Sequence, residues 1–329
     1  MFIKKVKKAE LEAVSSKNMD QERQENKIMR AWISFGVVII LLILLFFASI
    51  NIGSLKIGFG ELLSGLFVKY NKDVATIYDL RFPRIIISML AGAAIAVSGV
   101  LFQAVLKNPL ADPGIIGISS GASFTAVIIT AFAPTLYFFT PIAAFAGGVI
   151  AFFMVYCLSW KGGLSPMRII LTGVAAIVEA NITQKTWDDV MTLLPYVIAG
   201  LFLAMLFTQE CNLLSLEDKT ARSLGVNVNV TRIVISLVAV LLASISTAVA
   251  GAISFLGLIV PHIGRILVGS DHKMLLPFSA ISGAFTFLLA DTIGRTIAAP
   301  NEVSAAVIMS VVGGPFFILL LRRAGKYGK

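Results

Sequence analysis

Charged residues are scarce in this sequence. They make up 14% of its 329 residues, whereas hydrophobic residues make up 57%. Soluble domains carry about a quarter of their residues as charged side chains, so this chain lacks the polar residues to cover a water-exposed globule. The composition therefore excludes an ordinary soluble protein and favours one that lies in a membrane.

Cysteine and histidine are also rare, and each occurs only twice. Cys157 and Cys211 stand far apart and form no CxxC pair, which excludes a disulfide framework, and we interpret both as small apolar side chains. So few histidines make a histidine-based metal site unexpected. We predict that His262 is packed or hydrogen-bonded and that His272 lies in a solvated cytoplasmic turn, residues 271–273.

Motifs for nucleotide binding and for catalysis are missing as well. The nearest approach to GxxxxGK[ST], residues 264–270, lacks the lysine and begins within an apolar run. HExxH, a nucleophile elbow and paired carboxylates within apolar runs do not occur. We therefore expect no enzyme activity, no metal and no cofactor in this chain, so that any ATP and Mg must be bound by another subunit.

The sequence consists mainly of long apolar runs. A bilayer core about 30 Å thick needs about 20 helical residues, and most of the runs qualify: 32–52, 85–106, 114–134, 138–159, 190–208, 232–250, 252–269, 276–294 and 303–321. The run at 168–180 would rise only about 20 Å as a helix. We predict an all-α polytopic membrane protein with about ten transmembrane helices, of which the fifth is abnormally short.

Basic residues lie between the apolar runs and orient them, because cytoplasmic loops are rich in Lys and Arg. Residues 1–30 are polar, and we predict a cytoplasmic tail, part helix and part disordered, before one membrane domain over 31–325. If the chain crosses the membrane ten times, most Lys and Arg residues of the loops lie on the cytoplasmic side, and both termini are cytoplasmic. This count requires that residues 168–180 cross. We attribute the net charge of +9 to this orientation and not to nucleic-acid binding. The halves 85–180 and 232–321 start in opposite directions, which is typical of an inverted repeat.

Three blocks of polar, proline and glycine residues interrupt the apolar sequence. The first is LRFPR at 80–84, followed by Gln103 and by NPLADPGIIGISSGA at 108–122. The second is LEDKTARSLGV at 216–226, and the third is FLGLIVPHIGR at 255–265, followed by GSDHK at 269–273 and GGP at 313–315. Such residues within a membrane protein need a structural or functional reason.

Together these blocks closely resemble the family of permeases that import iron–siderophores, haem and vitamin B12 as membrane subunits of type II ABC importers. The motifs occur in the family's order over about residues 55–325. The resemblance implies import of an iron chelate, a siderophore or haem, across the bacterial cytoplasmic membrane by alternating access. It implies as partners a second permease subunit, two cytoplasmic ATPase subunits and an extracellular or periplasmic substrate-binding protein, with lipid around the chain.

The resemblance also assigns roles to individual residues. Outer arginines are expected to bind acidic residues of the binding protein, although they could simply be interfacial cations: Arg81, Arg84 and Arg295. The loop 212–231 is expected to be the coupling helix pair that docks on the ATPase, although it could be an ordinary connector. Its contact residues would be Glu217, Asp218, Ala221, Arg222, Leu224 and Gly225, with Gly225 ending a helix.

A third set is expected near the cytoplasmic gate, although the stretch 108–122 could be only a helix break. These residues are Asn108, Pro109, Ser119, Ser120, Gly121, Pro261 and His262. We expect the side chains of Asn108, Ser119 and Ser120 to satisfy backbone groups that the break exposes. Asp291 is expected to pair with Arg295 four residues on, or to satisfy a buried partner.

One region departs from the family. Between Gly173 and Trp187 the family has a full fifth span and an outer loop, and this chain is about one helix length shorter. We predict that the segment still crosses, partly extended through Thr183, with Glu179 and Asn181 facing the central cavity. Two alternatives stay open: a transport-impaired variant and an ion-coupled secondary transporter.

Overall fold

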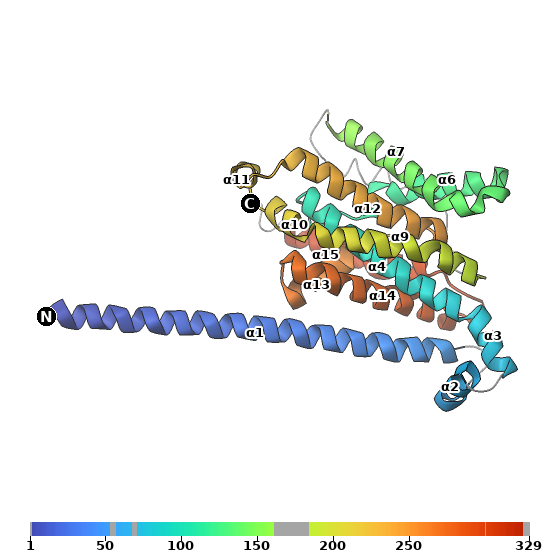
Figure 1. Cartoon of the computed structure of the whole chain (residues 1–329), viewed down its shortest axis with the longest axis horizontal. Coiled ribbons are helices and arrows are strands. Elements are labelled where there is room, and N and C mark those ends of the chain that lie inside the picture. Colours follow the sequence, from blue (N-terminus) through green and yellow to red (C-terminus); the bar gives the residue numbers. More distant parts are fainter. Residues whose placement is uncertain (1, 53–56, 68–70, 161–183, 300, 325–329) are drawn as a thin grey trace.

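The computed structural model describes the chain except for residues 1, 53–56, 68–70, 161–183, 300 and 325–329. Every regular element in the described part is a helix. The long helices lie side by side in one bundle (Figure 1), and seven helical segments are long and apolar enough to cross a membrane. The predicted all-α polytopic fold is therefore confirmed.

The long helices follow the apolar runs closely. They are α1 (Phe2–Asn51), α4 (Phe82–Val105), α7 (Thr140–Trp160), α9 (Trp187–Leu206), α12 (Val228–Ala250), α14 (His272–Ile297) and α15 (Ala305–Ala324). Some begin several residues before the hydrophobic run, because capping side chains fix the start of a helix. Asn227 accepts a hydrogen bond from the Val230 backbone N–H, and Asp271 accepts one from that of Lys273.

Two predicted spans are broken near their starts. The run 114–134 contains α5 (Pro113–Ile116) and α6 (Ile118–Phe132), and the run 252–269 contains only α13 (Leu256–Val268). Helices of 15 and 13 residues rise about 22 and 20 Å, too little to cross alone. The breaks therefore leave backbone groups within the bundle that the protein itself must satisfy.

Shorter helices lie at the two ends of the bundle. Helices α2 (Phe59–Phe67) and α3 (Lys72–Leu80) lie at one end, and α10 (Thr208–Leu214) and α11 (Asp218–Ser223) lie at the other, together with both chain termini (Figure 1). This is the arrangement that the distribution of basic residues predicts, with the termini and the loop 212–231 on one side of the membrane.

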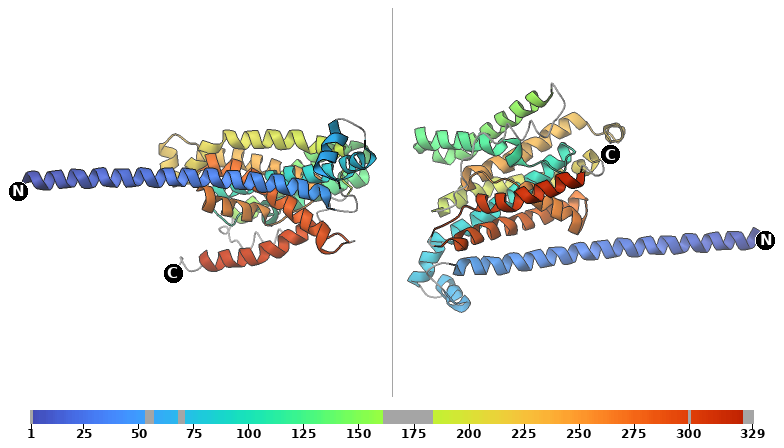
Figure 2. Two further views of the ribbon diagram at one scale, coloured as in Figure 1. Left: turned by 90° about the horizontal axis from the view of Figure 1, so that it is seen from below. Right: turned by 180° about the vertical axis from the view of Figure 1, so that it is seen from behind.

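Helix α1 extends far beyond the bundle (Figures 1 and 2). Its 50 residues rise about 75 Å, more than twice the thickness of a bilayer core. The tail over residues 1–30 was predicted to be part helix and part disordered; the structure describes a helix from Phe2 into the first span, and the cytoplasmic tail stays a prediction.

Helix α4 is the central element of the bundle. Nearly all of its residues after Ile87 are buried, and it packs against α9, α12, α13 and α14. Two glycine contacts allow this proximity: Gly99 lies against the backbone of Gly257 in α13, and Gly92 lies against that of Gly283 in α14. The Ser98 hydroxyl donates to the Ala239 carbonyl of α12 at 2.7 Å.

Helices α7 and α9 begin at the same end of the bundle. Tyr137, in the 3-10 helix η1 (Pro134–Phe139) just before α7, donates to Asp189 in the first turn of α9. The described chain thus leaves the bundle at the opposite end after Trp160 and reappears at the first end at Gln184 (Figure 1). The predicted crossing at 168–180, with Glu179, Asn181 and Thr183, lies outside the described residues.

This geometry gives a topological prediction. In a background without Cys157 and Cys211, a cysteine at Lys185 is expected to react with a membrane-impermeant thiol reagent from outside intact cells. A cysteine at Lys219, beside α11, is expected to react only after the membrane is opened. Labelling of both positions from the same side would contradict the ten-span topology.

Candidate functional sites at the two ends of the bundle

The outer end contains a compact cluster of alternating charges. Arg84 of α4 donates to both carboxylate oxygens of Asp291 of α14, at 2.8, 3.0 and 3.2 Å, and also to Glu302 at 2.8 Å. Asp291 pairs with Arg295, one turn further along α14, at 3.2 Å. The predicted pair of Asp291 and Arg295 is therefore confirmed, but the main partner of Asp291 is Arg84, which the sequence spacing did not reveal.

The cluster is almost completely removed from solvent. The exposed fraction of the side chain is 12% for Arg84, 1% for Asp291 and 8% for Arg295, whereas Glu302 is 40% exposed. Arg295 also donates to the Ser49 hydroxyl of α1, and Arg81 donates to the Ile50 carbonyl. The three arginines expected to dock the binding protein thus lie together, and they fasten α1, α4 and α14 to one another.

The orientation of these arginines limits their availability to a partner. Arg84 directs its guanidinium group at Asp291, and the Nε atom of Arg295 lies 3.2 Å from the same carboxylate, so an acidic partner of either arginine would compete with a buried carboxylate. Arg81 is partly exposed, and Glu302 is much more exposed than Asp291. The docking role of the three arginines stays a prediction, and their contacts within the chain are structural.

The two broken spans meet at a buried polar junction in the bundle. Asp112 caps α5 by accepting from the backbone N–H groups of Gly114 and Ile115 at 2.9 and 3.1 Å, and its carboxylate faces those of Phe255 and Gly257 at the start of α13. The carboxylate therefore caps α5 and lies close to the first residues of α13.

Gln103 of α4 completes this junction. Its amide donates to the carbonyl oxygens of Ala111 and Gly257 at 3.2 and 3.1 Å, and its oxygen accepts from Arg265. The predicted gate sequence is thus tied to α4 and α13 by side chains that satisfy broken backbone, as irregular membrane structure requires.

The predicted gate residues do not form one cluster. Asn108 accepts from the Leu110 backbone N–H at 2.9 Å, as expected, but Ser119 instead contacts Thr247 of α12 at 3.1 Å. Pro109 is exposed, Pro261 is buried within α13, and the ring of His262 packs edge-on against Phe316. Gly121 lies against Gly147 of α7, and Ser120 is partly buried. The main capping residue of the break is Asp112, which was not among the predicted gate residues.

At the cytoplasmic end, α11 is held by one carboxylate. Asp218 accepts from Lys107 at 2.7 Å and from Arg232 at 2.9 Å, so it joins α11 to the end of α4 and to α12. The hydrogen bond from Lys107, with the positive charge of Arg232, lowers the pKa of Asp218. The carboxylate therefore stays ionised near neutral pH and keeps α11 in place.

Gly225 ends α11 as predicted. Its φ of 86° is left-handed, its N–H donates to the Arg222 carbonyl at 3.0 Å, and the Val226 N–H donates to that of Ala221 at 3.2 Å. This pair of bonds is the Schellman motif, which favours glycine at this position.

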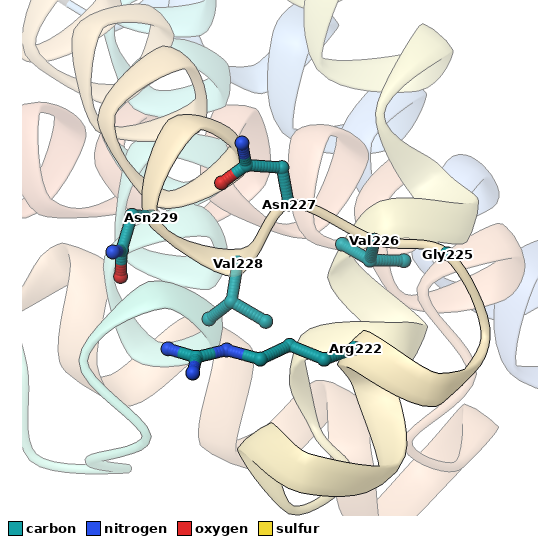
Figure 3. A pocket seen from close by; sticks show the side chains of 6 residues that line it. All are labelled: Arg222, Gly225, Val226, Asn227, Val228 and Asn229. Carbon is teal, nitrogen blue, oxygen red and sulfur yellow. The ribbon is translucent and has the colours of Figure 1, made fainter.

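The outward face of α11 differs from the predicted contact surface in one residue. Leu224 is 59% exposed and Glu217 and Arg222 are also exposed, but Ala221 is buried in the core and is unavailable to a partner. Arg222 and residues 225–229 line an open surface pocket of about 430 Å³ (Figure 3). Leu224 and this pocket, and not Ala221, are the features that α11 presents outward.

The turn 271–273 is also different from the prediction. His272 is buried, not solvated, and both it and Asp271 contact Asn212 of α10. Sequence reasoning missed Asn212, because a single amide at the end of an apolar helix has no recognisable pattern. No group of metal-binding side chains occurs among the residues that the structure describes.

A bundle of apolar helices with broken spans at its centre, an ion-paired outer end and a protruding cytoplasmic helix is the architecture of a membrane permease. The profile of the FecCD transport family matches residues 41–180 and 176–323, and the chain belongs to this family. The two matched segments overlap at residues 176–180, within the region that is shorter in this sequence than in the family.

Curated relatives and a solved structure agree with this assignment. The proteins named "Probable heme-iron transport system permease protein IsdF" of Staphylococcus aureus strains MSSA476 and Newman are each 40% identical over 304 residues, covering 87% of this chain and 94% of the relative. A metal-chelate type ABC transporter in an inward-facing conformation has 26% identity and a TM-score of 0.73, covering 88% of this chain and 99% of that one.

The ion cluster gives a prediction about stability. Replacing Asp291 by Asn leaves two buried arginines without their shared carboxylate, so we expect the detergent-purified protein to lose about 3 kcal/mol of unfolding free energy. Glu302→Gln is the matched control, because that carboxylate is half exposed, and it should cost less than about 1 kcal/mol. Equal effects of the two variants would contradict the structural role of Asp291.

Proposed function

We propose that this permease is the membrane subunit of an ABC importer and that its substrate is haem iron. The family, the name of its S. aureus relatives and the structural similarity to a metal-chelate type transporter support this proposal. The observation on which it rests most directly is α11, a short helix held by two ion pairs at the end of the bundle with Leu224 exposed. Leu224 and the open pocket formed by Arg222 and residues 225–229 lie next to each other at this end of the bundle, and we assign the docking surface to them.

In this proposal two ATPase subunits bind α11, Leu224 and the adjoining pocket on the cytoplasmic side, and a substrate-binding protein delivers haem at the outer end. A second permease subunit completes a central path. ATP binding and hydrolysis on the ATPase subunits switch the permease between outward-open and inward-open states. The chain carries no nucleotide motif of its own, so it contributes the path and the mechanical link.

The main alternative is a secondary transporter driven by protons or sodium, which needs ionisable groups that are free to bind the ion. Three carboxylates in the described part of the chain accept hydrogen bonds from other groups of the protein. Asp291 is paired with two arginines, Asp112 caps α5, and Asp189 accepts from Tyr137 and Thr186. These contacts favour ATP-driven transport over ion coupling.

The proposal predicts the energy source and the substrate. Proteoliposomes that contain the permease with its ATPase and binding protein are expected to accumulate haem when ATP is enclosed, and not when ATP is replaced by ADP. An uncoupler should not change the rate. Haem is expected to be preferred over a ferric siderophore and over cobalamin in competition. Uptake that persists without ATP and collapses with the uncoupler would overturn the ABC assignment.

The docking surface gives a second prediction. Leu224→Asp places a charge where an apolar contact is proposed, and it should weaken association with the ATPase by about tenfold or more. Leu80→Asp is the control, since Leu80 is also well exposed but lies at the opposite end of the bundle. Co-purification of the ATPase subunit from detergent measures the effect. Undiminished recovery with Leu224→Asp would exclude this residue from the interface.

A further inference from the structure

A single side chain joins α10 to the beginning of α14. The Asn212 amide oxygen accepts from the backbone N–H of His272 at 3.0 Å and lies 2.6 Å from the His272 Nδ1 atom. The amide nitrogen of Asn212 donates to Asp271 at 2.7 Å. Three hydrogen bonds therefore pass through one residue between the two helices.

The chemistry of this junction fits an amide better than other side chains. Asp271 is the N-cap of α14, and the hydrogen bond from the Lys273 backbone, with the one from Asn212, lowers its pKa. Asp271 is thus an ionised acceptor, whereas the His272 backbone N–H is a donor. Only a side chain that donates and accepts at once satisfies both, and asparagine does so. Because the Asn212 oxygen only accepts, His272 carries its proton on Nδ1.

The position of Asn212 connects the coupling segment to the core. Helix α10 immediately precedes α11, and its Cys211 and Leu214 are buried in the main hydrophobic core. Helix α10 is separated from α9 by a change of direction at Phe207, whose backbone is not helical. A displacement of α10 and α11 can therefore reach the bundle by several contacts: Asp218 joins α11 to Lys107 and to α12, and Asn212 joins α10 to α14.

Helix α14 extends from this junction to the outer ion cluster. Asp291 lies 20 residues after Asp271, a rise of about 30 Å along the helix. Between these two points α14 packs closely along α4 at the Gly92 and Gly283 contact. Both ends of α14 are thus fixed by polar contacts, to α10 at the cytoplasmic end and to Arg84 at the outer end.

We propose that Asn212 is a positioning residue for transport coupling. It transmits the displacement of α10 and α11 to α14, and α14 carries it to the Asp291 cluster at the outer end. This inference rests on the proposed ATP-driven import, because it assigns the route by which the ATPase acts on the permease.

The test compares amide variants of α10 in the assembled complex. Asn212→Ala is expected to assemble and to hydrolyse ATP at a basal rate near that of the wild type, while haem imported per ATP falls about tenfold. Gln209→Ala is the matched control, because it removes an exposed amide from the same helix and should leave this ratio unchanged. A purely structural defect would lower assembly and not the ratio.

Exchanging the amide and the carboxylate between positions 212 and 271 is expected to restore coupling. Asn212→Asp alone places two carboxylates together and should reduce the ratio further, whereas Asn212→Asp combined with Asp271→Asn restores a donor and an acceptor and keeps an N-cap. The double variant should recover most of the wild-type ratio. The double variant also tests the proposal if Asn212→Ala fails to assemble. A double variant that assembles but still imports little haem per ATP would refute the proposal.

The outcomes separate the two levels of inference. If wild-type vesicles show no ATP-dependent uptake, the proposed function fails. If the wild type imports haem and Asn212→Ala matches Gln209→Ala in uptake per ATP, the proposed function stands and the role of Asn212 is excluded.

Discussion

The absence of water from a bilayer core is the constraint on which this structure depends, because every polar group within the core needs a partner from the protein. Two of the spans are preceded by non-helical backbone within the bundle, at 111–112 and at 251–255. Asp112 and Gln103 make these breaks tolerable, since they satisfy backbone groups on both sides of the junction. The polar residues that interrupt the apolar sequence are therefore the cost of having non-helical backbone at this depth.

The same constraint explains the outer end. A carboxylate with 1% of its side chain exposed requires positive partners, and Asp291 has one from α4 and one from its own helix. Two of the arginines that the family resemblance assigns to docking, Arg84 and Arg295, are thus also internal counter-ions. A partner protein that bound these two arginines would compete with Asp291, so binding there would affect how firmly α4 and α14 are held together.

Membership in the FecCD family also puts the short region into context. The alignment with the S. aureus relatives extends over 304 positions, whereas 87% of this 329-residue chain is only about 286 residues. The relatives therefore have positions that this chain lacks. The family profile likewise matches in two segments that overlap at 176–180. The helices on either side, α7 and α9, still begin at the same end of the bundle, as a chain with an additional crossing between them requires.

The sequence by itself determined the membrane class, the positions of the long helices and the family, because hydrophobic length and local motifs are written in consecutive residues. It also predicted the glycine end of α11 and the pairing of Asp291 with Arg295, both of which depend on neighbours within a few residues. Only the tertiary structure decided that Arg84 is the main partner of Asp291, that Ala221 is buried and that Asn212 holds His272. These contacts join residues that are far apart in the chain or depend on which side of a short helix faces the core, and no local pattern specifies either.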